Sequence, residues 1–234
     1  MRAPRPYQWI AFDAVGTVIR PQPAAAEVYH QIASRFGSQI SAPEVTRRFR
    51  QAFHDSEQGD ASLPPNVRLA TSETNEYQRW QKIVATVLDD LPDIGPCFEA
   101  LFRHFGLPES WRCFDEVAEV LTALQSKGYQ IALASNFDKR LHSVCDGLPA
   151  LRDIGVRVIS SEVGYRKPAP GFYDALLAAT KCPPEQILMV GDDYTNDVVG
   201  ARAAGLPAVM VNRRSSPAPD ELSNLRELLP RLEL

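Results

Sequence analysis

Phe12-Asp13-Ala14-Val15-Gly16-Thr17-Val18 is the stretch that decides the fold, because it places an acid and a glycine directly after an apolar segment. The residues from Tyr7 to Asp13 have strong β preference and predict a strand, and Gly16 predicts a turn after it. Further apolar strands, each separated from the next by helical periodicity, are predicted at Ile131–Ser135, Val156–Ser160, Ile187–Gly191 and Ala208–Val211. This alternation predicts an α/β fold with a parallel sheet that is covered on both faces.

The segment from Ala24 to about Phe105 has a different pattern. Apolar residues recur at helical spacing, as at Val28, Ile32 and Phe36, and no alternating strand pattern is present. Several glycine and proline turn signals divide the segment into separate helices. We therefore expect a block of helices to interrupt the α/β region after its first strand.

Composition excludes several classes of protein. The chain has 234 residues, 44% of them hydrophobic, and a formal net charge of -4, which argues against nucleic-acid binding. No apolar run is long enough for a membrane span or a signal peptide. The four cysteines lie far apart and predict reduced thiols, and hence a cytoplasmic protein. Monomer and homodimer both remain open.

Polar side chains follow several predicted strands, where ligands bind in open parallel sheets. Asp13 ends the first strand, and Ser135 and Asn136 follow the second. Lys167 lies in the loop after the third strand, and the fourth is followed by acids at positions 192, 193 and 197. Clustered carboxylates repel one another unless a cation lies among them, and oxygen ligands without His or Cys favour Mg²⁺.

These segments resemble the four motifs of the haloacid dehalogenase-like hydrolases. The stretch from Phe12 to Val18 is similar to the first motif, Ser135-Asn136 to the second, Lys167-Pro168 to the third and Gly191–Asp197 to the fourth. Residues 135–141 most resemble the subgroup named for a rhythmically expressed gene product. The resemblance implies a Rossmann-like core of residues 1–21 and 109–234, and a helical cap of residues 22–108.

The resemblance also implies roles for single residues. Asp13 would be the nucleophile, Lys167 would hold it, Ser135 would bind the transferred group and Thr17 would orient the loop, with Gly16 and Asn136 also contacting substrate. The Mg²⁺ ligands would be Asp13, the Val15 carbonyl oxygen, Asp192 and Asp197. The expected substrate is a small, anionic, phosphorylated metabolite.

One position departs from the family pattern. The family's phosphatases carry a second aspartate two residues after the nucleophile, as acid and base, whereas this chain has Val15. A positioned acid or base contributes a factor of about 10²–10⁴ in rate. Three alternatives follow: a phosphatase for substrates with a good leaving group, a carbon–halogen hydrolase, or a non-catalytic binding relative. The acids of the fourth motif favour the metal-dependent hydrolase, because the family's dehalogenases work without metal and replace the first of them.

Other residues have ordinary structural interpretations. Tyr173 matches a dehalogenase position, but we expect it to pack on the sheet. The cap phenylalanines, Trp80 and Trp111 are expected in the core. Asp197 could cap the helix that we predict after it, and the charged segment from Glu221 to Glu233 predicts an exposed terminal helix.

Overall fold

A five-stranded parallel sheet forms the centre of the computed structural model, which describes residues 5–58, 63–213 and 218–233. The strand order is β5-β4-β1-β6-β7. In the central pairings Phe12 of β1 lies beside Leu133 of β4 and Val190 of β6. The strands are β1 (Trp9–Phe12), β4 (Gln130–Ser135), β5 (Val156–Ile159), β6 (Ile187–Gly191) and β7 (Ala208–Met210). The predicted α/β parallel-sheet fold is therefore confirmed.

Both faces of this sheet are buried. Ile10 and Phe12 point into one hydrophobic cluster and Ala11 into another, because successive side chains of a strand alternate between faces. The first face carries α6 (Val117–Ser126), α7 (Arg140–Gly147) and α11 (Leu228–Arg231), and the second carries α9 (Pro170–Thr180) and α10 (Gly200–Ala203). A short helix, α8 (Ser160–Val163), follows β5 directly.

The end of the chain differs from the prediction of an exposed terminal helix. Only Leu228–Arg231 is α-helical there, after a 3₁₀ turn at Leu225–Glu227. Leu222, Leu225 and Leu228 are fully buried in the same cluster as Phe12. The prediction was wrong because the charged residues hid a leucine repeat that covers the sheet.

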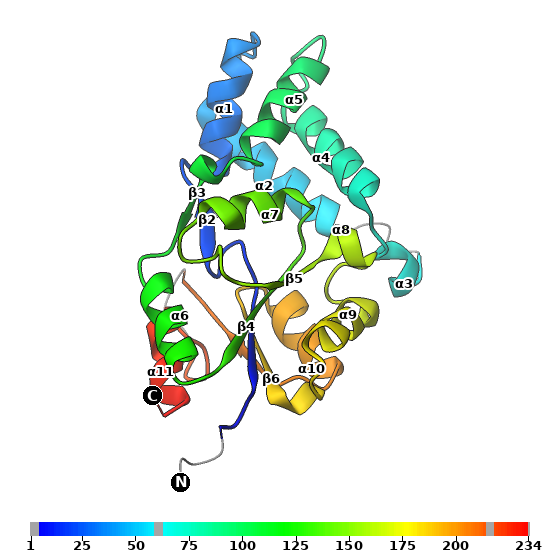
Figure 1. The fold of residues 1–234 in the computed structure, drawn as a ribbon. Coiled ribbons are helices and arrows are strands. Elements are labelled where there is room, and N and C mark those ends of the chain that lie inside the picture. Colours follow the sequence, from blue (N-terminus) through cyan, green and yellow to red (C-terminus); the bar gives the residue numbers. More distant parts are fainter. Residues whose placement is uncertain (1–4, 59–62, 214–217, 234) are drawn as a thin grey trace.

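A separate set of helices lies at one end of the molecule (Figure 1). These helices, here called the helical module, have their own hydrophobic cluster that includes Tyr29, Val84 and Phe98. Ser72 caps one of them by accepting a hydrogen bond from the Asn75 amide. The module comprises α1 (Ala25–Arg35), α2 (Ala42–Gln58), α4 (Glu73–Val87) and α5 (Gly95–His104). The short helix α3 (Pro65–Arg68) lies apart from them, at the level of α8 and α9 in Figure 1.

A two-stranded antiparallel ribbon joins the helical module to the sheet. It pairs β2 (Ile19–Pro21) with β3 (Trp111–Cys113), so the chain enters and leaves the module side by side. Ile19–Pro21 forms a strand because the returning chain supplies hydrogen-bonding partners far away in the sequence.

The segment after β6 also differs from expectation. Instead of an α-helix beginning at Asp197, Tyr194–Val199 forms a π-helix that continues into α10. Asp193 caps it, because its carboxylate accepts a hydrogen bond of 2.8 Å from the Asn196 amide. Asp197 is therefore not the cap, and its buried side chain accepts a 3.0 Å bond from the Asp193 amide. Wider π-helical turns are frequent at functional sites.

No helix in the described part of the chain has the length and apolar character needed to cross a bilayer.

Candidate active site

Three acids from distant parts of the sequence meet at the carboxyl edge of the sheet. Asp13 follows β1, Asp192 follows β6 and Asp197 lies on the π-helix. One carboxylate oxygen from each lies within 4.8 Å of the others. Asp13 and Asp197 are 8% and 1% exposed, so water screens their repulsion poorly.

Gly16 allows the first loop to approach Asp192. Its φ angle is +92°, and a Cβ atom there would lie 2.2 Å from the Asp192 carboxylate. A glycine is therefore required both for the backbone conformation and for the space.

The ammonium group of Lys167 lies among these acids. Its Nζ donates to Asp13 at 2.8 Å, to Asp197 at 2.6 Å and to the Ala134 carbonyl oxygen at 2.7 Å. Burial alone would lower the pKa of Lys167, but Asp13 and Asp197 outweigh it and raise the pKa, so the lysine stays charged. We call Asp13, Lys167, Asp192 and Asp197 the acidic cluster.

The acidic cluster carries more negative charge than its lysine balances. Burial raises the pKa of Asp13, and it raises the pKa of Asp192 and of Asp197 to about 6. The negative charge of Asp197 adds to the increase in the pKa of Asp192. A divalent cation fits this set, because the donors are hard oxygen ligands and the excess charge is two when all three acids are ionised.

The other sequence-predicted residues surround the acidic cluster. Thr17 donates a 3.2 Å hydrogen bond to Asp192, and buried Ser135 lines the cavity above the cluster. The Asn136 amide exchanges two hydrogen bonds, of 2.7 and 3.0 Å, with the backbone of Lys167. Asn136 therefore holds the lysine loop, although it also lines the cavity.

Val15 lies on the cavity wall with 37% of its surface exposed. The position at which the family's phosphatases carry their acid and base thus faces the site, but with an apolar side chain. Tyr173, the residue shared with dehalogenases, is fully buried, and its hydroxyl donates to the Asn196 carbonyl oxygen. It packs on the sheet, as the sequence predicted, and is not among the residues that line the cavity.

The cavity has a volume of about 860 Å³ and is bordered by both the sheet region and the helical module. Several aromatic residues line it. Phe49, Phe53 and Trp80 of the module, which the sequence assigned to the core, are not fully buried, because one side of each faces the cavity. Trp111 is 4% exposed and belongs to the core, as the sequence predicted. Phe114 and Phe137 of the sheet region also line the cavity.

Sequence reasoning missed Arg213, which supports the first loop. Its guanidinium donates to the backbone carbonyl oxygens of Gly16 and Thr17 at 3.1 and 2.8 Å, and pairs with Glu116 at 2.7 Å. The available signal was its place just after β7, at the same edge of the sheet as the acidic cluster.

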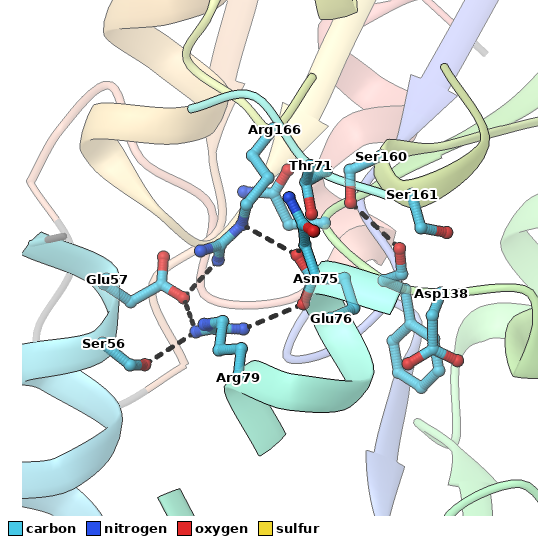
Figure 2. Close-up of polar contacts among 12 residues, drawn as sticks. Ser56, Glu57, Thr71, Asn75, Glu76, Arg79, Asp138, Ser160, Ser161 and Arg166 are labelled. Carbon is cyan, nitrogen blue, oxygen red and sulfur yellow. Dashed lines mark hydrogen bonds and ion pairs between the residues drawn. The ribbon is translucent and has the colours of Figure 1, made fainter. Parts of the chain in front are cut away.

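A second set of charges was also missed, and it joins the helical module to the lysine loop (Figure 2). Glu57 of α2 pairs with both Arg79 of α4 and Arg166, the neighbour of Lys167. Glu76 lies 3.3 Å from Arg79 and 3.6 Å from Arg166. We call these four residues the paired network. Their spacing along the chain gives no sign that they meet.

The fold and the acidic cluster define a class of α/β hydrolases, and comparison with known proteins gives the family. The model of the haloacid dehalogenase-like hydrolases matches residues 7–205. The chain belongs to this family, and it is an enzyme of the hydrolase class.

Two curated relatives span nearly the whole chain. The human haloacid dehalogenase-like hydrolase domain-containing protein 3 is 26% identical, covering 96% of this chain and 93% of its own. The rhythmically expressed gene 2 protein of Drosophila melanogaster is 21% identical, covering 92% and 86%. The resemblance to that subgroup is confirmed.

Solved structures share the fold. A putative HAD-hydrolase of Bacillus subtilis, described as bound to magnesium, has a TM-score of 0.78 at 17% identity, with 97% of this chain and 99% of that chain covered. An L-2-haloacid dehalogenase of Xanthobacter autotrophicus has a TM-score of 0.71 at 17% identity, with 97% and 98% covered. This chain therefore shares its fold with a magnesium-bound hydrolase and with a dehalogenase.

Proposed function

We propose that this hydrolase is a Mg²⁺-dependent phosphatase that uses Asp13 as its nucleophile and acts on a small phosphorylated molecule. The acidic cluster carries the proposal, because two buried acids and a half-buried one, with a single lysine among them, need a further cation. The carboxylates of Asp13 and Asp192 and the Val15 carbonyl oxygen would hold the ion, with Asp197 direct or through water. When bound, Mg²⁺ would neutralise charge on the transferred phosphoryl group.

The chain's own residues supply the remaining chemistry. The Asp13 carboxylate attacks phosphorus, the bond to the leaving oxygen breaks, and water later hydrolyses the aspartyl phosphate. Lys167 holds Asp13 in place and offsets charge on the phosphoryl oxygens, and Ser135 donates to one of them. Asn136 contributes by fixing the backbone of Lys167, and Thr17 by fixing Asp192.

We further propose that residues 22–108 act as a cap over a core of residues 1–21 and 109–234. The separate hydrophobic cluster of the helical module supports this division, and the cavity between the two parts supports a site that closes over substrate. The excess of basic residues needed to recruit a nucleic acid is missing, so we propose a small-molecule substrate.

A dehalogenase is the second candidate, and Val15 is the observation in its favour, since a departing halide needs no proton. Asp192 and Asp197 argue against it, because these acids, one half-buried and one buried, lie beside Asp13 and repel it without a cation.

Turnover with two substrates separates these candidates. Release of phosphate from an aryl phosphate that requires Mg²⁺ and disappears in Asp13→Asn is the expected result. Halide release from a 2-haloacid in the presence of chelator, without phosphatase activity, would overturn the proposal in favour of the dehalogenase. Mg²⁺ binding without either activity would indicate a binding protein.

A further inference from the structure

The Val15 side chain cannot donate a proton to the group that leaves the phosphoryl group, and this limits which phosphate esters the site can hydrolyse. A phosphate ester of an ordinary alcohol needs a proton on the departing oxygen, and a valine side chain supplies none. Outside the acidic cluster, and apart from Asp193 and the largely exposed Tyr194, two side chains on the cavity wall could be considered as donors, Glu57 and Tyr29.

Neither of these side chains is suited to donate a proton. Burial opposes ionisation of Glu57, but Arg166 and Arg79 outweigh it and lower its pKa, so Glu57 stays an unprotonated acceptor. Burial raises the pKa of Tyr29 far above neutrality, which makes its phenol a very weak acid. The carboxylate of Asp193, also on the wall, is occupied in capping the π-helix. The site is thus built for a leaving group that departs as a stable anion.

The cavity wall selects for shape as well. In the helical module the ring of Phe53 lies 6.1 Å from that of Phe49, in a stacked arrangement, and 6.0 Å from that of Trp80. In the sheet region, the rings of Trp111 and Phe137 meet edge to face at 5.8 Å, and ring contacts through Tyr29 and Phe105 connect them to Phe49. Partly exposed aromatic surface of this kind gains about 25 cal/mol per Å² when an apolar group covers it, and it favours planar rings.

The charges on the wall indicate that the leaving group is uncharged. In the part of the chain that the structure describes, three arginines line the cavity, and each has an acidic partner. Arg79 belongs to the paired network, Arg140 donates to Asp138 at 2.6 and 2.7 Å, and Arg213 pairs with Glu116. A second phosphate or a carboxylate on the substrate would have to compete with these acidic partners for the guanidinium groups.

We propose that the substrates are phosphate monoesters of uncharged aromatic hydroxyl compounds, whose ring lies against this aromatic surface of the cavity. This inference rests on the proposed phosphatase function. The Asp13 oxygen forms a bond to phosphorus while the bond from phosphorus to the aryl oxygen breaks, and its electron pair leaves with the phenolate. Water then releases inorganic phosphate and regenerates Asp13, and the phenolate takes a proton from solvent.

Steady-state kinetics with Mg²⁺ test the proposal on three probes. Phenyl phosphates of graded leaving-group acidity carry the ring, acetyl phosphate has a good leaving group without a ring, and glycerol phosphate has neither. We expect kcat/KM for phenyl phosphates to exceed that for acetyl phosphate at least tenfold, to rise with leaving-group acidity, and glycerol phosphate to be hydrolysed least.

Variants of the wall distinguish recognition of the ring from structural damage. Phe53→Ala and the milder Phe49→Leu should raise KM for phenyl phosphate at least fivefold and should affect KM for acetyl phosphate much less. Phe36→Ala, which removes an exposed ring that does not line the cavity, should alter neither.

The possible failures are separable. Equal or better turnover of glycerol phosphate, or equal losses on both substrates in the Phe53 and Phe49 variants, would overturn the inference and leave the phosphatase function standing. Absence of turnover even with acetyl phosphate would overturn the phosphatase function, and the inference with it.

Discussion

The acidic cluster and the paired network lie close together at the lysine loop, yet their charges are composed differently. The acidic cluster has three carboxylates and one ammonium, whereas the paired network has two carboxylates and two guanidinium groups. Adjacent residues serve them, Lys167 in one and Arg166 in the other. The charges of the paired network balance, and its ion pairs hold the helical module to the sheet region. The acidic cluster has excess negative charge, which favours binding of a cation and catalysis there.

The largest loss of activity is expected when the acidic cluster loses its nucleophile, Asp13. Asp13→Asn keeps the shape of the side chain but cannot form the aspartyl phosphate, so phosphatase activity should fall by at least ~10³-fold. Phosphate release measures this, with Asp174→Asn on the exposed face of α9 as a matched control. Retention of a tenth or more of the activity would contradict the role of Asp13.

The reverse experiment adds the missing acid. Val15→Asp should increase turnover of glycerol phosphate by about 10²-fold, since a positioned acid has an effect of that order. Phenyl phosphates with acidic leaving groups should gain much less, because they need no proton. A comparison of kcat/KM on both substrates checks this, and an equal gain on both would show that Val15 acts only through shape or metal binding.

The pH dependence of metal stabilisation follows from the raised pKa values in the acidic cluster. Because Asp192 and Asp197 have folded-state pKa values of about 6, above the ordinary carboxyl range, they hold protons in the folded protein at pH 5 that the unfolded chain has lost. Their contribution to stability without metal therefore falls as pH rises through 6. Mg²⁺ requires the ionised acids, so the increase in Tm on adding Mg²⁺ should be small at pH 5 and larger at pH 7. A Tm increase that is independent of pH would contradict this.

Substitution in the paired network should lower the free energy of unfolding. Glu57→Gln leaves two arginines facing Glu76, and the free energy of unfolding should fall by about 1–2 kcal/mol, less than for a fully buried pair because Glu57 is partly exposed. Urea denaturation measures the loss. Glu44→Gln on the same helix removes an exposed, solvent-screened pair and should lower the free energy of unfolding clearly less. Equal losses in the two variants would show that the paired network is no stronger than surface pairs.

Much of the fold could be predicted because it depends on local pattern. The apolar strands around Phe12, Leu133 and Val190 and their alternation with helices identify a parallel sheet. The rule that ligands bind at the carboxyl edge indicated where Asp13, Lys167 and Asp192 would be found.

The remaining features depend on contacts between segments far apart in sequence. The β2–β3 ribbon exists only because its strands meet after more than eighty intervening residues. The π-helix turns Asp197 inward through tertiary packing, which no local signal encodes. The aromatic residues of the module have core-like spacing, and only the fold shows that Phe53 and Trp80 face a cavity.

Titration calorimetry with Mg²⁺ tests the central claim most directly, because it measures whether the acidic cluster needs a cation. The wild-type protein should bind one ion at millimolar or lower concentration at pH 7, and Asp192→Asn should lose this binding while remaining folded. Wild-type protein that binds no Mg²⁺, or a variant that binds it equally well, would contradict the account.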